Sequence, residues 1–267
     1  MTDYLELEKA VIAVTAQAAA LVRQTDFQIH QKADVVDIVT SSDLLVQHFL
    51  QEKLAALLPG SGFYCEEENV RDLTREYVWV IDPIDGTANY ARGIDNCVIS
   101  VALVHHGNAV VGVVRNIFKE DVYAATIGTG ARKNGRQIHV SERPFEDGLF
   151  CTAMSLYRKE FAPVCNDIIF DTYMKCNDVR RFGSCAVELC YLAEGKCELY
   201  FELRVFPWDY AAALLILQEA GGVLHGFADE KLEFNKPTVL VGANNVENYR
   251  VLANIVRNHL TSVPYEE

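Results

Sequence analysis

The chain has 267 residues, half of them hydrophobic, which is enough for a sizeable core in one large domain or two small ones. Acidic residues outnumber basic ones 37 to 24, and the net charge of -13 disfavours nucleic acid and anionic membranes as partners. The eight cysteines include no CxxC pair, the start MTDYLELEKAVIAV lacks the positive charge of a signal peptide, and no apolar run approaches a membrane span. These features predict a reduced, cytoplasmic protein.

The first half of the chain is rich in predicted strands. Apolar residues recur at helical spacing from Leu5 to Val22 and predict an opening amphipathic helix. A short strand over 35–39 and a helix ending at Pro59-Gly60 should follow. Further strands are predicted at 62–65, 78–81, 98–104, 109–114 and 122–126, and Asn134-Gly135 predicts a tight turn in a last hairpin.

From about residue 146 helices alternate with short strands. The predicted elements are a helix over 160–172, a strand over 179–182, a helix from Ser184, a strand over 197–200, a helix from Trp208, strands over 222–225 and 238–242, and a helix over 246–260. The pattern predicts layered α/β or α+β packing in two closely joined subdomains, residues 1–145 and 146–267.

Two acids flank a proline in the stretch WVIDPIDGTANY, residues 79–90. We expect a buried strand to end at Asp82, because Pro83 cannot continue the ladder. Asp85 can then point toward the same space, and the carbonyl of Ile84 is released from pairing. Carboxylate and carbonyl oxygens are the ligands that Mg²⁺ prefers, and Gly86-Thr87 allow backbone N–H groups to approach a phosphate. The alternative is that both acids only shape a turn.

Two further acidic segments bear on this choice. The stretch FYCEEEN follows a predicted strand, and FPWDYAAALLILQEAGG places Asp209 at the start of a helix. Taken alone, Asp209 is explained as an acid favoured by the helix dipole. The paired histidines His105-His106 are interpreted as a solvated hairpin turn, and the GxG of GTGAR as another hairpin rather than a nucleotide site.

Together these segments resemble the inositol monophosphatase family of Mg²⁺-dependent, lithium-sensitive phosphatases. WVIDPIDGTANY and WDYAAALLILQEAGG are similar to its two signatures, and CEEEN stands where its glutamate pair belongs. DIVTSSD and RRFGSCAVELC are similar to two more of its elements. The order and spacing agree over nearly the whole chain, and the resemblance implies a five-layer αβαβα sandwich and a possible homodimer.

The resemblance also implies roles for individual residues. It implies that two or three Mg²⁺ ions are held by Glu66, Asp82, the Ile84 carbonyl, Asp85 and Asp209. It implies that Glu66 and Thr87, backed by Asp43, orient the attacking water. The implied substrate-binding set is Asp85, Gly86, Thr87, Gly183, Ser184, Cys185, Glu202, Asp209 and Lys32, the last on a loop that closes over the metals. Cys65 stands where the family has glycine, so the glutamate ligand could be displaced by one position; alignment from Phe63 favours Glu66.

Charge explains why such a cluster needs cations. Two carboxylates about 4 Å apart repel by about 4 kcal/mol at an effective dielectric of about 20, and four would not stay ionised unaided. The implied reaction is hydrolysis of inositol 1-phosphate or a related small polyol phosphate. The alternatives are a fructose-1,6-bisphosphatase, a phosphatase acting on 3′-phosphoadenosine or NADP, and, outside catalysis, a regulatory binding protein. The complete set of acids favours an enzyme.

Overall fold

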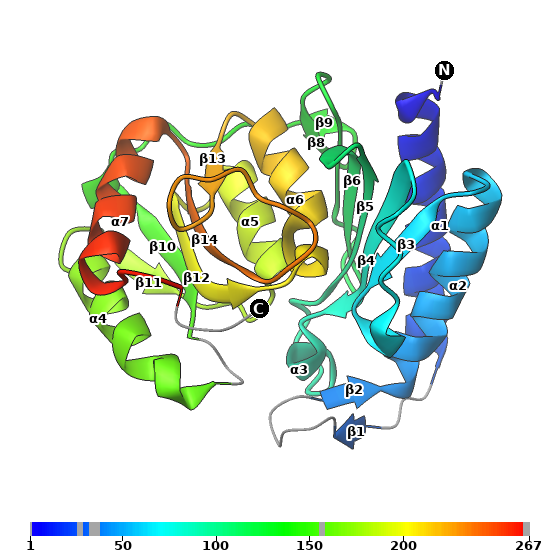
Figure 1. The fold of residues 1–267 in the computed structure, drawn as a ribbon, viewed down its shortest axis with the longest axis horizontal. Helices are drawn as coiled ribbons and strands as arrows, with labels where there is room; N and C mark the ends of the chain where they lie inside the picture. Colours follow the sequence, from blue (N-terminus) through cyan, green and yellow to red (C-terminus); the bar gives the residue numbers. More distant parts are fainter. Residues whose placement is uncertain (1, 26–28, 32–37, 155–157, 264–267) are drawn as a thin grey trace.

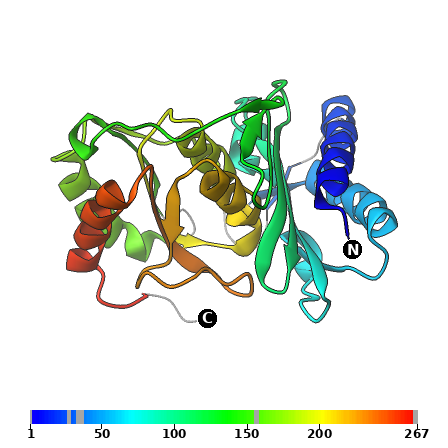
Figure 2. The same ribbon diagram turned by 90° about the horizontal axis from the view of Figure 1, so that it is seen from above.

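The computed structural model describes residues 2–25, 29–31, 38–154 and 158–263, which stack in five layers. A pair of helices covers a seven-stranded sheet, a second pair lies between this sheet and a five-stranded one, and a third pair closes the far side (Figures 1 and 2). This arrangement confirms the predicted αβαβα sandwich.

The first layer consists of α1 (Tyr4–Gln24) and α2 (Ser41–Leu57). The side chain of Asp3 caps α1 by accepting hydrogen bonds from the N–H groups of Leu5 and Glu6. The apolar stripe of the helix is buried on the sheet, as predicted. Before α2, β1 (Ile29–Gln31) pairs with β2 (Ile38–Thr40) in an antiparallel ladder. The strand predicted over 35–39 overlaps β2, and its remainder lies outside the described residues.

The larger sheet contains every strand predicted in the first half beyond residue 60. Its strands, in spatial order, are β3 (Gly62–Cys65), β4 (Tyr77–Asp85), β5 (Val98–His105), β6 (Asn108–Asn116), β7 (Val122–Thr126), β8 (Ala131–Lys133) and β9 (Arg136–Gln137). The β3–β4 pair is parallel and the other pairs are antiparallel. Asn134 and Gly135 both have positive φ, as the predicted tight turn requires.

The prediction that β4 ends at Asp82 is wrong. The ladder is interrupted after Asp82, which pairs with Ser100, and resumes at Asp85, which pairs with Val98. Three steps along β4 therefore oppose two along β5, which defines a bulge. Pro83 lies within the bulge, where no ladder hydrogen bond is required of it. The bulge keeps both acids on the same strand at the same end of the sheet.

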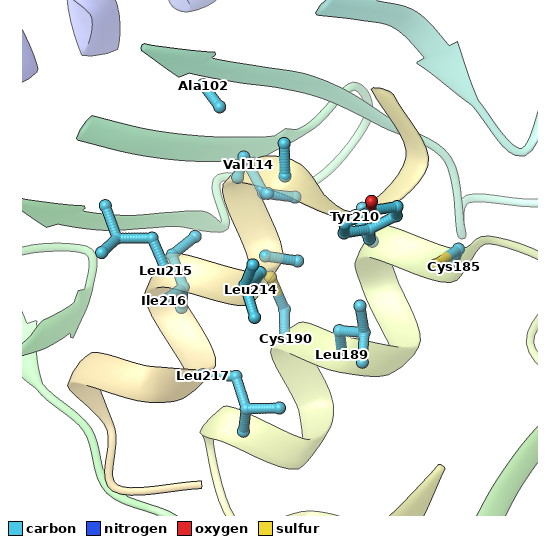
Figure 3. Close-up of a cluster of buried hydrophobic side chains, with 14 of the residues drawn as sticks. Ala102, Val114, Cys185, Leu189, Cys190, Tyr210, Leu214, Leu215, Ile216 and Leu217 are labelled. Atoms are coloured by element: carbon cyan, nitrogen blue, oxygen red, sulfur yellow. The ribbon is translucent and has the colours of Figure 1, made fainter. Parts of the chain in front are cut away.

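The middle layer consists of α5 (Cys185–Ala193) and α6 (Pro207–Glu219), which pack on each other and on both sheets. Both helices are apolar on nearly all sides, as expected of helices buried between two sheets. Figure 3 shows Cys190 of α5 next to Leu214 of α6, below Ala102 and Val114 of the larger sheet. This layer joins the two halves of the molecule.

The smaller sheet has the spatial order β11-β10-β12-β14-β13, and α4 and α7 cover its outer face. The elements are β10 (Leu149–Ala153), α4 (Ala162–Tyr173), β11 (Asp178–Arg180), β12 (Leu199–Val205), β13 (Val223–His225), β14 (Thr238–Ala243) and α7 (Val246–His259). Strand β10 is missing from the sequence prediction, and β12 is longer than predicted. The subdomain boundary at 145/146 stays a prediction.

All eight cysteines are free thiols. Within the described part of the chain, no helix combines the length and apolar character that a membrane crossing requires.

Gly112 of β6 offers a test of the contact between the larger sheet and the middle layer. A Cβ atom at this position would lie 2.6 Å from the Ala212 carbonyl oxygen of α6. We expect Gly112→Ala to lower the free energy of unfolding by about 1–3 kcal/mol, because the sheet and helix must move apart. Urea denaturation measures the loss. Gly60→Asn is the control, because nothing lies within 4 Å of its Cβ position and asparagine tolerates the positive φ. Equal decreases in the free energy of unfolding for the two variants would contradict the proposed close packing.

Candidate active site

Four acids from three segments of the chain meet at one end of the larger sheet. Glu66 directly follows β3, Asp82 and Asp85 lie at the end of β4, and Asp209 lies in the first turn of α6. Asp82 is hydrogen-bonded to Glu66 and interacts electrostatically with Asp85 and Asp209. The structure therefore brings together the four side chains that the sequence predicted as metal ligands.

The electrostatic state of these carboxyls reflects burial and like charge. Burial, followed by the charges of Glu66, Asp85 and Asp209, raises the pKa of Asp82 well above its usual value. Burial, followed by the charges of Asp85 and Glu66, raises the pKa of Asp209 in the same way. Asp209 also accepts a hydrogen bond from the backbone N–H of Phe206 at 2.7 Å, so it caps α6 in addition to joining the cluster.

Asp85 connects the larger sheet to α5. One of its carboxylate oxygens accepts hydrogen bonds from the Ser184 hydroxyl at 2.6 Å and from the Ala186 N–H at 2.7 Å. Burial raises the pKa of Asp85 to about 6, and these bonds oppose the increase. The adjacent Gly86 has a φ of 90°, and a Cβ atom there would lie 2.9 Å from the Asn96 carbonyl oxygen. Glycine is thus required at this turn both for conformation and for space.

Thr87 and Asp43 lie beside this turn. Thr87 begins the short helix α3 (Thr87–Tyr90), and its hydroxyl donates to the Ile84 carbonyl at 2.9 Å, with the Asp43 carboxylate at 3.4 Å. Asp43 is fully buried in the first turn of α2. The predicted association of Thr87 with Asp43 is thus present, and the Ile84 carbonyl, predicted to be released from pairing, accepts this hydroxyl.

The predicted substrate side is formed by the start of α5 and by β12. Glu202 accepts a hydrogen bond from the Tyr200 hydroxyl at 2.6 Å, and burial raises the pKa of Glu202 to about 7 while this hydroxyl lowers it. Cys185 is buried beside the same tyrosine, and burial raises the pKa of its thiol well above the usual value. A reactive thiolate is therefore not expected at this position.

Two residues that hold the Gly183 turn are absent from the sequence prediction. Asn89 donates to the carbonyls of Asn96 and Phe182, both at 2.7 Å, and so links the two halves of the chain. Glu188 of α5 accepts from the N–H groups of Phe182 at 2.6 Å and Gly183 at 3.0 Å. An acid within the apolar run CAVELC is the signal that could have identified Glu188; Asn89 has no comparable signal.

Lys32, predicted to lie on a loop over the metals, is outside the described residues. In the segment CEEEN, Glu66 reaches the acid cluster, whereas Glu67 is bound through its backbone to the Gln47 side chain. Glu68 is exposed and lies 2.7 Å from His48. This arrangement favours Glu66 over its neighbours as the glutamate of the site.

The donor set fits divalent cations. Glu66, Asp82, Asp85 and Asp209 supply only oxygen atoms, and each of the three aspartates has its pKa raised above the usual value by burial. A cation of high charge density would remove the repulsion that burial intensifies and is the natural counterion for hard oxygen donors.

The chain is similar to known proteins in both sequence and fold. A model of the inositol monophosphatase family matches residues 2–261. The Nus factor SuhB of Escherichia coli K12 is 32% identical over 193 residues, which is 72% of each chain. The solved structure of a Thermotoga maritima IMPase is 26% identical, with a TM-score of 0.83 over 97% of this chain and all of the other. An IMPase/NADP phosphatase complexed with Mg²⁺ and phosphate is 22% identical and shares the fold, with a TM-score of 0.85 over 94% of this chain and 95% of the other.

The chain belongs to the inositol monophosphatase family. Membership supports phosphatase activity in general, and solved structures in the family include a complex with Mg²⁺.

Glu188 predicts a specific pH dependence of stability. Burial raises the pKa of Glu188 from 4.5 to about 8, and its second oxygen is buried with no hydrogen-bond partner among the described residues. As the pH rises, the unfolded chain releases this proton before the folded chain does. The stabilisation is therefore complete below about pH 4.5 and is lost as the pH rises through about 8.

The difference in unfolding free energy between wild type and Glu188→Gln should fall over this interval, by at most about 1.4 kcal/mol per pH unit. Urea denaturation at several pH values measures this difference, in which contributions common to both chains cancel. Parallel curves would show that Glu188 titrates at its ordinary pKa.

Proposed function

We propose that this protein is a Mg²⁺-dependent, lithium-sensitive phosphomonoesterase that hydrolyses inositol 1-phosphate or a related small polyol phosphate. The observation that carries the proposal is the convergence of Glu66, Asp82, Asp85 and Asp209 at one end of the larger sheet. Such a set is destabilising without counterions. Family membership independently supports a phosphatase.

Side chains and backbone groups of this chain can be assigned to cation binding, to phosphate binding and to orientation of the attacking water. Glu66, Asp82, the Ile84 carbonyl, Asp85 and Asp209 would hold the cations, two or three Mg²⁺ ions in our proposal. When bound, Mg²⁺ would supply positive charge to stabilise the phosphoryl group and to acidify water. Gly86 and Thr87 would orient the phosphate through N–H groups and the hydroxyl, which already donates to Ile84. Glu66 and Thr87, with Asp43 behind them, would orient the attacking water.

The substrate's alcohol would lie against the start of α5 and against β12. Gly183, Ser184 and Cys185 line one side, and Glu202 would accept a hydrogen bond from a hydroxyl of the alcohol. The Tyr200 hydroxyl fixes the position of the Glu202 carboxyl. This acceptor favours a polyol, whose hydroxyls donate. The alternatives are a sugar bisphosphate and a 3′-phosphoadenosine or NADP phosphatase, and the printed name of one solved relative, IMPase/NADP phosphatase, keeps the last alternative open.

Asp82→Asn tests the proposed cation site. The variant keeps the oxygen that accepts from the Ile84 N–H but loses the charge. We expect Mg²⁺-dependent phosphate release to fall roughly 100-fold or more, because positioned charge dominates such catalysis. Stability without Mg²⁺ should not fall, since repulsion is relieved, whereas the increase in melting temperature on adding Mg²⁺ should shrink. Glu68→Gln is the control because Glu68 is exposed beside His48; equal behaviour of the two variants would refute the assignment.

Glu202→Gln tests the identity of the substrate. Loss of a charged acceptor costs about 1.5–3 kcal/mol, so KM for inositol 1-phosphate should rise at least about tenfold while kcat changes less. Rates with and without Mg²⁺ and Li⁺ on inositol 1-phosphate, fructose 1,6-bisphosphate, 3′-phosphoadenosine compounds and NADP measure this effect. The exposed Glu142→Gln is the control. Faster turnover of another ester than of inositol phosphates would reverse the order of candidates.

The second candidate is a regulatory binding protein, alone or in addition to catalysis. It is favoured by the name of the curated relatives, Nus factor SuhB, which denotes a factor rather than an enzyme. The expectation that nucleic acid is not a partner rests on net charge alone, and no comparison supports it. The homodimer and the cytoplasmic location also stay predictions. A chain without measurable hydrolysis of the whole panel in Mg²⁺ would favour this candidate.

A further inference from the structure

The pair His105-His106 differs from the solvated turn that the sequence predicted. His106 and Gly107 form the two-residue turn, with φ of 48° and 71°, but His105 is the last residue of β5 and its side chain is only 24% exposed. Its ring stacks on Tyr77 with the centroids 4.3 Å apart, and its Nδ1 lies 2.7 Å from the Tyr4 hydroxyl. His105 is thus held in place from two sides.

Three donor atoms converge beside this ring. Glu76 Oε1 lies 3.1 Å from His105 Nε2 and 3.9 Å from His106 Nε2, and the ligand atoms of all three residues lie within 4.8 Å of one another. Tetrahedral coordination at about 2.0–2.1 Å places neighbouring ligands about 3.4 Å apart. The side chains of Glu76 and His106 are 61% and 71% exposed, so they are free to make the small rotations needed.

We propose that Glu76, His105 and His106 bind a transition-metal ion of the Zn²⁺ class. Two imidazoles and one carboxylate suit Zn²⁺, Ni²⁺ or Cu²⁺, whereas Mg²⁺ prefers oxygen alone. Glu76 precedes Asp82 by six residues on an extended strand, which separates this site from the acid cluster by roughly 20 Å. The inference does not depend on the proposed phosphatase function.

A hydrogen-bonded chain from Tyr4 through His105 to Glu76 is the competing explanation. With Glu76 ionised, His105 Nε2 carries the proton and Nδ1 accepts from Tyr4. That chain gives no role to His106, whose ring centroid lies 4.2 Å from that of His105. In the metal-bound form the ion takes the place of the Nε2 proton, and Nδ1–H donates to Tyr4. Such a second partner is the usual support of a ligating histidine.

Tyr4 is suited to this supporting role. Burial, followed by a hydrogen bond with Tyr77, raises the pKa of Tyr4 to about 12, so its hydroxyl stays protonated and able to donate or accept. An ion at this site would connect α1 to β4 and to the β5–β6 turn.

A cavity adjoins the proposed site. It has a volume of about 550 Å³, and its lining includes Glu76 and His106 together with the apolar side chains of Val78, Val104 and Phe234. An ion held by three protein ligands retains a coordination position for water or another donor. The cavity gives this position room for a small molecule that combines a donor atom with an apolar body.

The test is Zn²⁺ titration of the full, untagged chain by calorimetry in excess Mg²⁺, which keeps the acid cluster occupied. We expect one site that is weakened at least about tenfold in His106→Ala and about 10–100-fold in Tyr4→Phe. His48→Ala, which removes another exposed histidine beside a glutamate, should bind as wild type does. Mg²⁺-dependent hydrolysis should be the same in all three variants and the parent, which separates failure of this proposal from failure of the proposed function.

Electron paramagnetic resonance of bound Cu²⁺ provides an independent readout. The acid cluster contains no nitrogen ligand, so hyperfine coupling to two nitrogens that is lost in His106→Ala would assign the ion to this site. Equal Zn²⁺ affinity in wild type and His106→Ala, or nitrogen coupling that persists in that variant, would overturn the proposal.

Discussion

Repulsion among buried carboxylates is the constraint on which the candidate site depends. Burial raises the pKa of Asp82, Asp85 and Asp209, and the charge of Asp85 raises the pKa of both Asp82 and Asp209 further. A fold that only had to be stable would separate these groups or replace them. Their convergence at one end of the larger sheet is consistent with a counterion of high charge, and under the proposed function stability is given up here for catalysis.

The layered fold makes this concentration of charge possible. The bulge in β4 keeps two acids on one strand, the start of α6 brings a third, and the chain after β3 brings the fourth. Asp85 is bound by the start of α5, and Asn89 spans from the Asn96 carbonyl to the Phe182 carbonyl. The site thus lies where the two halves of the chain meet. The apolar contact between α5 and α6 fixes the position of one half against the other (Figure 3).

Elements with strong periodicity could be predicted, and those that depend on tertiary contacts could not. Apolar residues at helical spacing predict the opening helix, and nearly continuous apolar runs predict β5 and β6, which are buried on both faces. The prediction that the strand ends before Pro83 fails because the rule against proline in ladders is local and does not reveal that a bulge removes the need for its hydrogen bond. Strand β10 is missing from the sequence prediction because Leu149–Ala153 is short and no turn residue marks its end. The sequence predicts a turn at His105 because its contact with Tyr4 joins positions 101 apart, which no local pattern reveals.

The acids of the site could be predicted as a set only by resemblance, since each has an ordinary local explanation, and for Asp209 that explanation is also correct. Its carboxyl caps α6 and joins the cluster at once. The two roles are compatible because a carboxylate has two oxygens and several lone pairs. A helix start aimed at a cluster of acids can therefore satisfy its own N–H groups while it contributes charge. Glu202 and Cys185 both contact Tyr200. Under the proposed function these residues face the alcohol of the substrate, so relatives that share the fold would differ in substrate through changes here.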